Sequence, residues 1–216
     1  MYQTILFDLD GTLTDSGIGI INSVMYALEK FDIHVPDRTS LYSFIGPPLV
    51  ESFEEHYGFD RQQAERAVSY YREYFSRKGI YENRPYDGIK KLLAELKDSG
   101  KVLIVATSKL EKFADEVLKH FELYDYFDFV AGSSPDGTRI EKGEIITYAL
   151  EKAGVAERES AIMVGDREHD IMGAKEAGID SLGVLYGYGS REELVMAGAD
   201  FLAEDVGTVA KIIGEI

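Results

Sequence analysis

Two patterns of hydrophobic and polar positions alternate along the chain and predict strands and helices in turn. Short apolar runs, which predict buried strands, occur at residues 5–7, 102–106, 127–131, 161–164, 181–186 and 201–202. Apolar residues that recur every three or four positions predict helices over 89–96, 113–121, 141–153, 171–177 and 206–213. Strands that alternate with helices in this way favour a parallel sheet covered on both faces.

One long stretch departs from this alternation. Residues 15–79 have helical spacing, for example over 18–28, 49–57 and 64–75, and we expect no strand there. The fold class predicted is therefore α/β, a doubly wound, Rossmann-like parallel sheet with a small all-helical insertion after its first strand. The expected domains are an α/β core (1–14 and 82–216) and a helical cap (15–81), which we expect to act as a lid.

Composition narrows the class of protein. Among 216 residues, 45% are hydrophobic and 29% are charged, which is typical of a globular protein, and cysteine is absent, which fits a cytoplasmic location. The net charge of −16 argues against binding of a nucleic-acid polymer, whose phosphates attract basic surfaces. No apolar run approaches the roughly 20 residues that span a bilayer, and no signal segment is recognisable, so we expect no membrane partner.

Carboxylates follow two of the predicted strands. Asp8 and Asp10 come directly after the first apolar run, and Asp166 and Asp170 follow the fourth. Because ligands bind at the carboxyl ends of parallel strands, we expect these acids to lie close together. Like charges at short range repel, so the cluster needs a counter-ion, and Mg²⁺ prefers oxygen ligands. Two structural alternatives stay open: an Asp-Gly turn at Asp10-Gly11, and a helix N-terminus stabilised by Asp170.

Hydroxyl and amino groups stand at comparable positions. Thr107 and Ser108 follow the second apolar run, where hydroxyl and N–H groups suit a phosphate oxygen; a plain helix N-cap is the alternative. Lys142 begins a predicted helix, where its positive charge is unfavourable beside the positive end of the helix dipole. We therefore expect an acid nearby; the alternative is that Lys142 is an ordinary surface lysine. Lys109 is a weaker candidate for the same task. The glycine-rich turn at 186–189 fits the rim of a site or an ordinary turn.

The order of these motifs along the chain is distinctive: Asp-x-Asp-Gly-Thr at 8–12, then Thr107, Lys142 and Gly-Asp-x-x-x-Asp at 165–170. Over essentially the whole chain, this order resembles the haloacid dehalogenase-like superfamily of phosphohydrolases. The helical insertion is similar to the small cap of the phosphoglycolate phosphatase-like members. Residues 44–49 resemble the cap loop that faces the active site in that group. One departure is that no proline follows Lys142.

The resemblance implies roles for individual residues. Asp8 would be the nucleophile, which forms an aspartyl-phosphate. Asp10 would protonate the leaving alcohol and then activate water, and since dehalogenases of the superfamily lack this acid, Asp10 favours phosphoester chemistry. Thr107 and Lys142 would complete the catalytic set by binding the transferring phosphoryl group.

The resemblance also implies ligands for the phosphate and the metal. The residues expected at the phosphate or substrate are Gly11, Thr107, Ser108, Lys142, Gly46 and Pro47. Mg²⁺ would be held by Asp8, by the backbone carbonyl of Asp10, and by Asp166 and Asp170.

The first functional hypothesis is a Mg²⁺-dependent phosphatase of a small phosphorylated metabolite, most similar to phosphoglycolate phosphatase. Alternatives are a 5′-nucleotidase or a β-phosphoglucomutase-like phosphomutase, and less favoured is a non-catalytic phosphate-binding protein. We expect a monomer or a homodimer.

Overall fold

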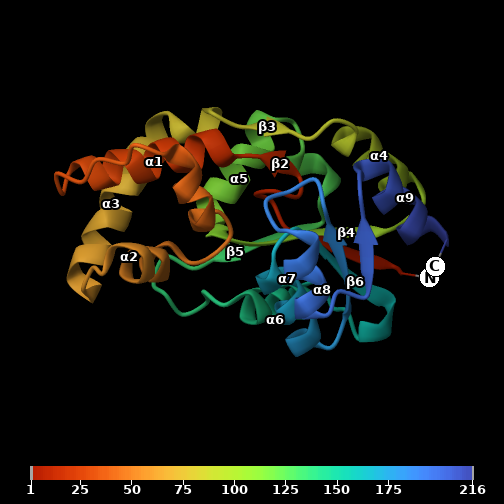
Figure 1. The fold of residues 1–216 in the computed structure, drawn as a ribbon. Coiled ribbons are helices and arrows are strands. Elements are labelled where there is room, and N and C mark those ends of the chain that lie inside the picture. Colours follow the sequence, from red (N-terminus) through yellow and green to blue (C-terminus); the bar gives the residue numbers. More distant parts are fainter. Residues whose placement is uncertain (1, 216) are drawn as a thin grey trace. The chain divides into compact units, whose positions relative to one another are not determined.

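The core of the protein is a parallel six-stranded sheet (Figure 1). The computed structural model describes residues 2–215. The strands of this sheet are β1 (Thr4–Phe7), β4 (Val102–Leu110), β5 (Phe129–Ser133), β6 (Ala161–Gly165), β7 (Asp180–Val184) and β8 (Phe201–Ala203). Their order in space is β5-β4-β1-β6-β7-β8. The chain thus proceeds outward from β1 on one side and returns to continue beyond β1 on the other, which places β1 at the centre.

Helices cover both faces of the sheet. Successive residues of a strand point to opposite faces, so the residues of the central strands are buried on both sides. Leu6 packs into a cluster with Ile145 and Ala174 of two helices, whereas its neighbours Ile5 and Phe7 are equally buried and point the other way. The helices of this part of the chain are α4 (Ile89–Asp98), α5 (Glu111–His120), α6 (Lys142–Lys152), α7 (Glu168–Ala177), α8 (Arg191–Ala197) and α9 (Val206–Glu215), with single 3-10 turns η3 (Tyr124–Tyr126) and η4 (Arg158–Ser160).

The chain divides into two compact units. The first runs up to Thr14 and resumes at Pro85, and the second is Asp15–Arg84. The helices of the second unit are α1 (Gly17–Glu29), η1 (Arg38–Phe44), α2 (Leu49–Tyr57), α3 (Arg61–Arg77) and η2 (Gly79–Tyr81). Aromatic rings pack together within it: the ring of Phe53 lies 5.0 Å from that of Phe44 and 6.0 Å from that of Phe59. The predicted α/β class with a helical insertion after β1 is confirmed.

Some boundaries differ from the sequence-based prediction. The strand expected over 102–106 continues to Leu110, which pairs with Ser133 of β5 after a shift of register between Ala106 and Leu110. The expectation of no strand from residue 15 onward is wrong at Asp15, where β2 (Thr14–Asp15) pairs with β3 (Arg84–Pro85). Helix α8 was not expected, since it is short and exposes Val195 and Met196. No helix within residues 2–215 has the length and hydropathy to cross a membrane.

Candidate active site

The site begins where β1 ends. The amide of Asp8 donates to the carbonyl of Val164, 2.9 Å away, so the pairing of β1 with β6 continues one residue past the strand. This pairing leaves the Asp8 side chain, with a residue exposure of only 4%, at the carboxyl end of the central strands. The prediction that the first apolar run delivers a carboxylate to this edge matches the geometry.

A tight loop follows Asp8 and returns the chain on itself. The carbonyl of Leu9 accepts from the amides of Leu13 and Thr14 at 3.0 and 2.9 Å, and Gly11 N donates to Thr14 O at 2.8 Å. Gly11 has φ +84°, and a Cβ at this position would lie 2.2 Å from Asp166 Oδ2. Only glycine meets both requirements. Gly11 therefore allows the loop after β1 to approach the carboxylate after β6.

Three carboxylates converge at this edge of the sheet. Asp8, Asp166 and Asp170 each place one oxygen within 4.8 Å of the others, and all three residues are buried. Burial raises the pKa of Asp8 to about 6 although Lys142 opposes the shift. The pKa of Asp166 is raised well above its usual range, first by burial and then by the charges of Asp170 and Asp8. Without a cation, the environment thus disfavours ionisation of the cluster.

A single buried lysine lies among these acids. Lys142 Nζ lies 2.9 Å from Asp8 Oδ1 and 2.7 Å from Asp170 Oδ1, and it donates to the carbonyl of Ala106 at 3.1 Å. Burial alone would lower the pKa of Lys142, but the charges of Asp170 and Asp8 raise it overall. The nearby acids expected from the position of this lysine at the N-terminus of α6 are therefore present.

The donor set suits a hard divalent cation. Three buried carboxylates carry up to three negative charges, and Lys142 offsets one of them. Carboxylate oxygens are the ligands that Mg²⁺ and Ca²⁺ prefer, and a nearby cation would remove the electrostatic cost that raises the pKa of Asp166. Asp8, Asp166 and Asp170 therefore fit a metal site.

Asp10 is not one of these three converging side chains and pairs with a different lysine. Its Oδ2 forms an ion pair of 2.6 Å with Lys109 Nζ, whereas its Oδ1 is buried without a hydrogen-bond partner. The predicted use of its backbone carbonyl as a metal ligand remains a prediction.

Neighbouring groups fix the orientation of the two later carboxylates. Asp166 accepts from Thr12 Oγ1 at 3.3 Å and from the amide of Tyr188 at 2.8 Å. Asp170 Oδ2 accepts from the amide of Arg167 at 3.0 Å while its Oδ1 contacts Lys142. Asp170 thus accepts a hydrogen bond at the start of α7 and also belongs to the acid cluster. From the sequence, these two positions had been alternatives.

The other predicted residues belong to both units of the chain. Thr107 is buried on the irregular part of β4, and its hydroxyl accepts from Lys109 N at 3.3 Å; Ser108 is half-buried beside it. Gly46 and Pro47 lie in the second unit, between η1 and α2. Their roles at the phosphate or substrate remain predictions.

The sequence did not assign the contacts that Thr12, Lys109 and Tyr188 make with the acids. Thr12 also accepts, through its carbonyl, a hydrogen bond of 3.1 Å from the hydroxyl of Tyr186. The glycine-rich turn at 186–189 was the available signal for the tyrosines. Of its two interpretations, a position beside the acids is the one that the structure supports.

Known proteins are similar to this chain in sequence and in fold. A family model described as haloacid dehalogenase-like hydrolase matches residues 5–184. A 5′-nucleotidase from Pseudomonas aeruginosa is 49% identical over 193 residues, which are 89% of this chain and 87% of that protein. The tyrosine-protein kinase PtkA from Mycobacterium tuberculosis is 41% identical over 187 residues; they are 87% of this chain but 63% of that protein, less than two thirds of its length.

Solved structures extend the comparison. The crystal structure of a predicted phosphatase from Clostridium acetobutylicum is 50% identical, covers 100% of both chains and has a TM-score of 0.97. A predicted phosphoglycolate phosphatase from Haemophilus somnus has a TM-score of 0.84 over 98% of this chain and 97% of that chain, but it is only 23% identical, so this likeness concerns the fold alone.

Proposed function

The chain belongs to the haloacid dehalogenase-like hydrolases, and from this we propose that it is a Mg²⁺-dependent phosphatase of nucleoside 5′-monophosphates. The observation that carries the proposal is the convergence of three buried carboxylates beside one buried lysine at the carboxyl ends of β1 and β6. Such a site combines a nucleophile with the charge compensation that phosphoryl transfer requires.

The substrate class rests on relatedness. The relative that is 49% identical over most of both chains is a 5′-nucleotidase. Phosphoglycolate, the first choice from the sequence, has weaker support, because the phosphoglycolate phosphatase compared above is 23% identical. We therefore favour a nucleoside monophosphate, the alternative that the sequence left open, over phosphoglycolate.

In the proposed mechanism, Asp8, Asp166 and Asp170 would hold the Mg²⁺ ion. When bound, the ion supplies positive charge that offsets the repulsion between the substrate phosphate and these carboxylates. Lys142 adds a second positive charge beside Asp8, and its three short contacts fix its position. Thr107 would donate a hydrogen bond to the phosphoryl group.

The reaction would proceed in two displacements. A carboxylate oxygen of Asp8 attacks phosphorus, the bond to the ester oxygen breaks, and the leaving alcohol takes a proton from Asp10. Water then attacks phosphorus of the aspartyl-phosphate and gives a proton to Asp10. The bond between phosphorus and Asp8 breaks, so inorganic phosphate is released and the Asp8 carboxylate is restored. Both steps use charge that the buried site already holds in place.

Phosphate release from a panel of substrates tests the proposal. The panel contains nucleoside 5′-monophosphates, phosphoglycolate, pyrophosphate and a sugar phosphate, each assayed with Mg²⁺ and with EDTA. We expect the highest kcat/KM for a nucleoside monophosphate and no activity in EDTA until Mg²⁺ is restored. Asp8→Asn should lower phosphate release at least roughly 100-fold, as expected on loss of a group that acts in the chemical step.

The control is Asp125→Asn, which changes an exposed aspartate of η3 and should retain full activity. Substantial turnover by Asp8→Asn, or activity that is indifferent to EDTA, would contradict the mechanism. Preference for phosphoglycolate would overturn only the substrate class. Conversion of a sugar 1-phosphate to the 6-phosphate with little free phosphate would identify a mutase instead.

A further inference from the structure

Two buried lysines divide the acids of the site between them. Lys142 Nζ is within hydrogen-bond distance of Asp8, Asp170 and the carbonyl of Ala106. Lys142 is thereby engaged with three oxygens, none of which belongs to Asp10. Asp10 is paired instead with Lys109, at 2.6 Å, and the two side chains are only 11% and 6% exposed respectively.

The two carboxylate oxygens of Asp10 have different surroundings. Oδ2 contacts Lys109, whereas Oδ1 is buried and has no hydrogen-bond partner. Buried polar atoms are normally paired, so an unpaired one calls for an explanation, and a catalytic role is one that fits its place beside the acid cluster. The ion pair therefore fixes the carboxylate by one oxygen and leaves the other available.

We propose that Lys109 is a positioning residue for proton transfer: it holds Asp10 by Oδ2, so that Oδ1 exchanges protons with the substrate oxygens. The inference rests on the proposed function, which assigns both proton transfers to Asp10. In the first, Asp10 is in its acid form with the proton on Oδ1; the phosphorus–oxygen bond of the ester breaks, its electron pair stays on the leaving oxygen, and that oxygen takes this proton. In the second, the attacking water loses its proton to Oδ1 as its oxygen bonds to phosphorus, and the bond from phosphorus to the Asp8 oxygen breaks with its electron pair returning to the Asp8 carboxylate.

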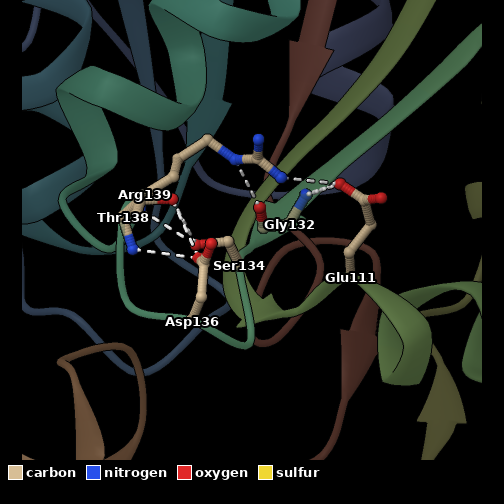
Figure 2. A network of polar contacts seen from close by, with 6 residues as sticks. All are labelled: Glu111, Gly132, Ser134, Asp136, Thr138 and Arg139. Carbon is tan, nitrogen blue, oxygen red and sulfur yellow. Dashed lines mark hydrogen bonds and ion pairs between the residues drawn. The ribbon is translucent and has the colours of Figure 1, made fainter.

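The backbone of Lys109 is itself held by the neighbouring strand. Figure 2 shows Arg139 reaching both Gly132 and Glu111: its Nε donates to Gly132 O at 2.9 Å and its Nη2 to Glu111 Oε2 at 2.8 Å. A Cβ on Gly132 would lie 2.7 Å from the carbonyl oxygen of Lys109, so glycine permits this close approach of β5 to the end of β4. The network thus fixes the segment from which Lys109 reaches Asp10.

A comparison of leaving groups tests the role. An alkyl phosphate, such as a nucleoside 5′-monophosphate, needs a proton on its leaving oxygen, whereas 4-nitrophenyl phosphate releases a stable phenolate without one. General acid catalysis contributes about 10²–10⁴-fold, so misplacing the acid in Lys109→Met should lower kcat/KM roughly 10-fold or more for the alkyl ester and under about 3-fold for the aryl ester. Asp10→Asn should have the same selectivity.

A double-mutant cycle separates this role from others. If Lys109 acts through Asp10, adding Lys109→Met to Asp10→Asn should cause no further loss with either ester. Lys109→Met alone leaves the buried Asp10 carboxylate without its partner, which can prevent this variant from folding. The double variant lacks that carboxylate, so its comparison with Asp10→Asn still tests the inference. Lys112→Met, on the exposed start of α5, is the matched control and should behave as wild type.

Equal losses with both esters would overturn the inference, since they would mean that Lys109 binds the phosphoryl group itself. A further loss in the double variant would overturn it as well. Failure of the proposed function is a separate result: wild-type protein with Mg²⁺ would then release no phosphate from either ester.

Discussion

At the scale of single residues, Lys142 is the cation on which the charge balance of the acid cluster depends. It contacts Asp8 and Asp170 directly, and its side chain is 6% exposed. An acid whose buried partner is removed keeps its desolvation cost but loses the compensating charge, which is why breaking a buried ion pair costs more than the pair contributes. Lys142 therefore supports folding as well as catalysis.

We predict that Lys142→Met destabilises the metal-free protein by about 3 kcal/mol, the scale of a broken buried pair. The double variant Lys142→Met/Asp170→Asn should recover at least about 1 kcal/mol of that loss, because one of the two unpaired charges is gone. Urea unfolding in EDTA measures both values. Equal stability of the single and double variants would argue against charge repulsion as the cause.

At the scale of elements, Asp128 connects α4, β4 and β5. Its carboxylate lies 2.8 and 2.9 Å from Lys97 Nζ on α4 and accepts from the amide of Leu103 on β4 at 2.9 Å. Although partial burial would raise the pKa of Asp128, the hydrogen bonds from Lys97 and Leu103 lower it overall. A carboxyl whose pKa is depressed by folding stabilises the native state only while it is ionised.

The sign of the pH dependence follows from this shift. The contribution of Asp128 is fully present above the ordinary aspartate pKa of about 3.9 and is lost as the pH falls through its lower pKa in the folded protein. We predict that Asp128→Asn costs about 0.5–1 kcal/mol at pH 7, as for an exposed ion pair, and that the difference from wild type shrinks below about pH 4.

Unfolding followed between pH 2 and pH 7 measures this difference. Asp125→Asn, which also removes one exposed carboxylate nearby, is the control and should show no such trend. A gap between Asp128→Asn and wild type that stays constant down to the lowest pH would show that the charge of Asp128 does not contribute.

At the scale of the whole molecule, the net charge of −16 means that any cation favours the folded state by screening repulsion. Ions bound by Asp8, Asp166 and Asp170 would act differently, because they bind the native site and stabilise it by mass action. The two effects are separable by comparing Mg²⁺ with a monovalent salt at equal ionic strength.

We predict that Mg²⁺ at about 100 times its dissociation constant stabilises the protein by about 2.7 kcal/mol beyond the salt control. At this chain length, that corresponds to a rise in Tm of roughly 5–10 °C. Asp166→Asn should abolish the Mg²⁺-specific part and keep the response to salt. Thermal unfolding in Mg²⁺ and in matched NaCl measures both, and equal shifts in the two salts would speak against a metal site.

Much of the architecture followed from local patterns. Hydrophobic periodicity predicted the alternating core and the helical insertion, and the order of Asp8, Thr107, Lys142 and Asp166 indicated a phosphohydrolase, which the comparisons confirm. Helix α8 was not predicted from the sequence because Leu194 is its single buried side chain, so the helix has almost no apolar face. Short elements of this kind have too little periodicity to recognise.

The sequence by itself determined that carboxylates follow β1 and β6, because the buried apolar runs at 5–7 and 161–164 end just before Asp8 and Asp166. Only the tertiary structure decided how the charges pair. Thr12 and Asp166 are 154 positions apart, and Lys109 reaches Asp10 from a strand whose register shifts nearby. Such a shift changes the direction of side chains, and it arises from packing between strands, which no local pattern records.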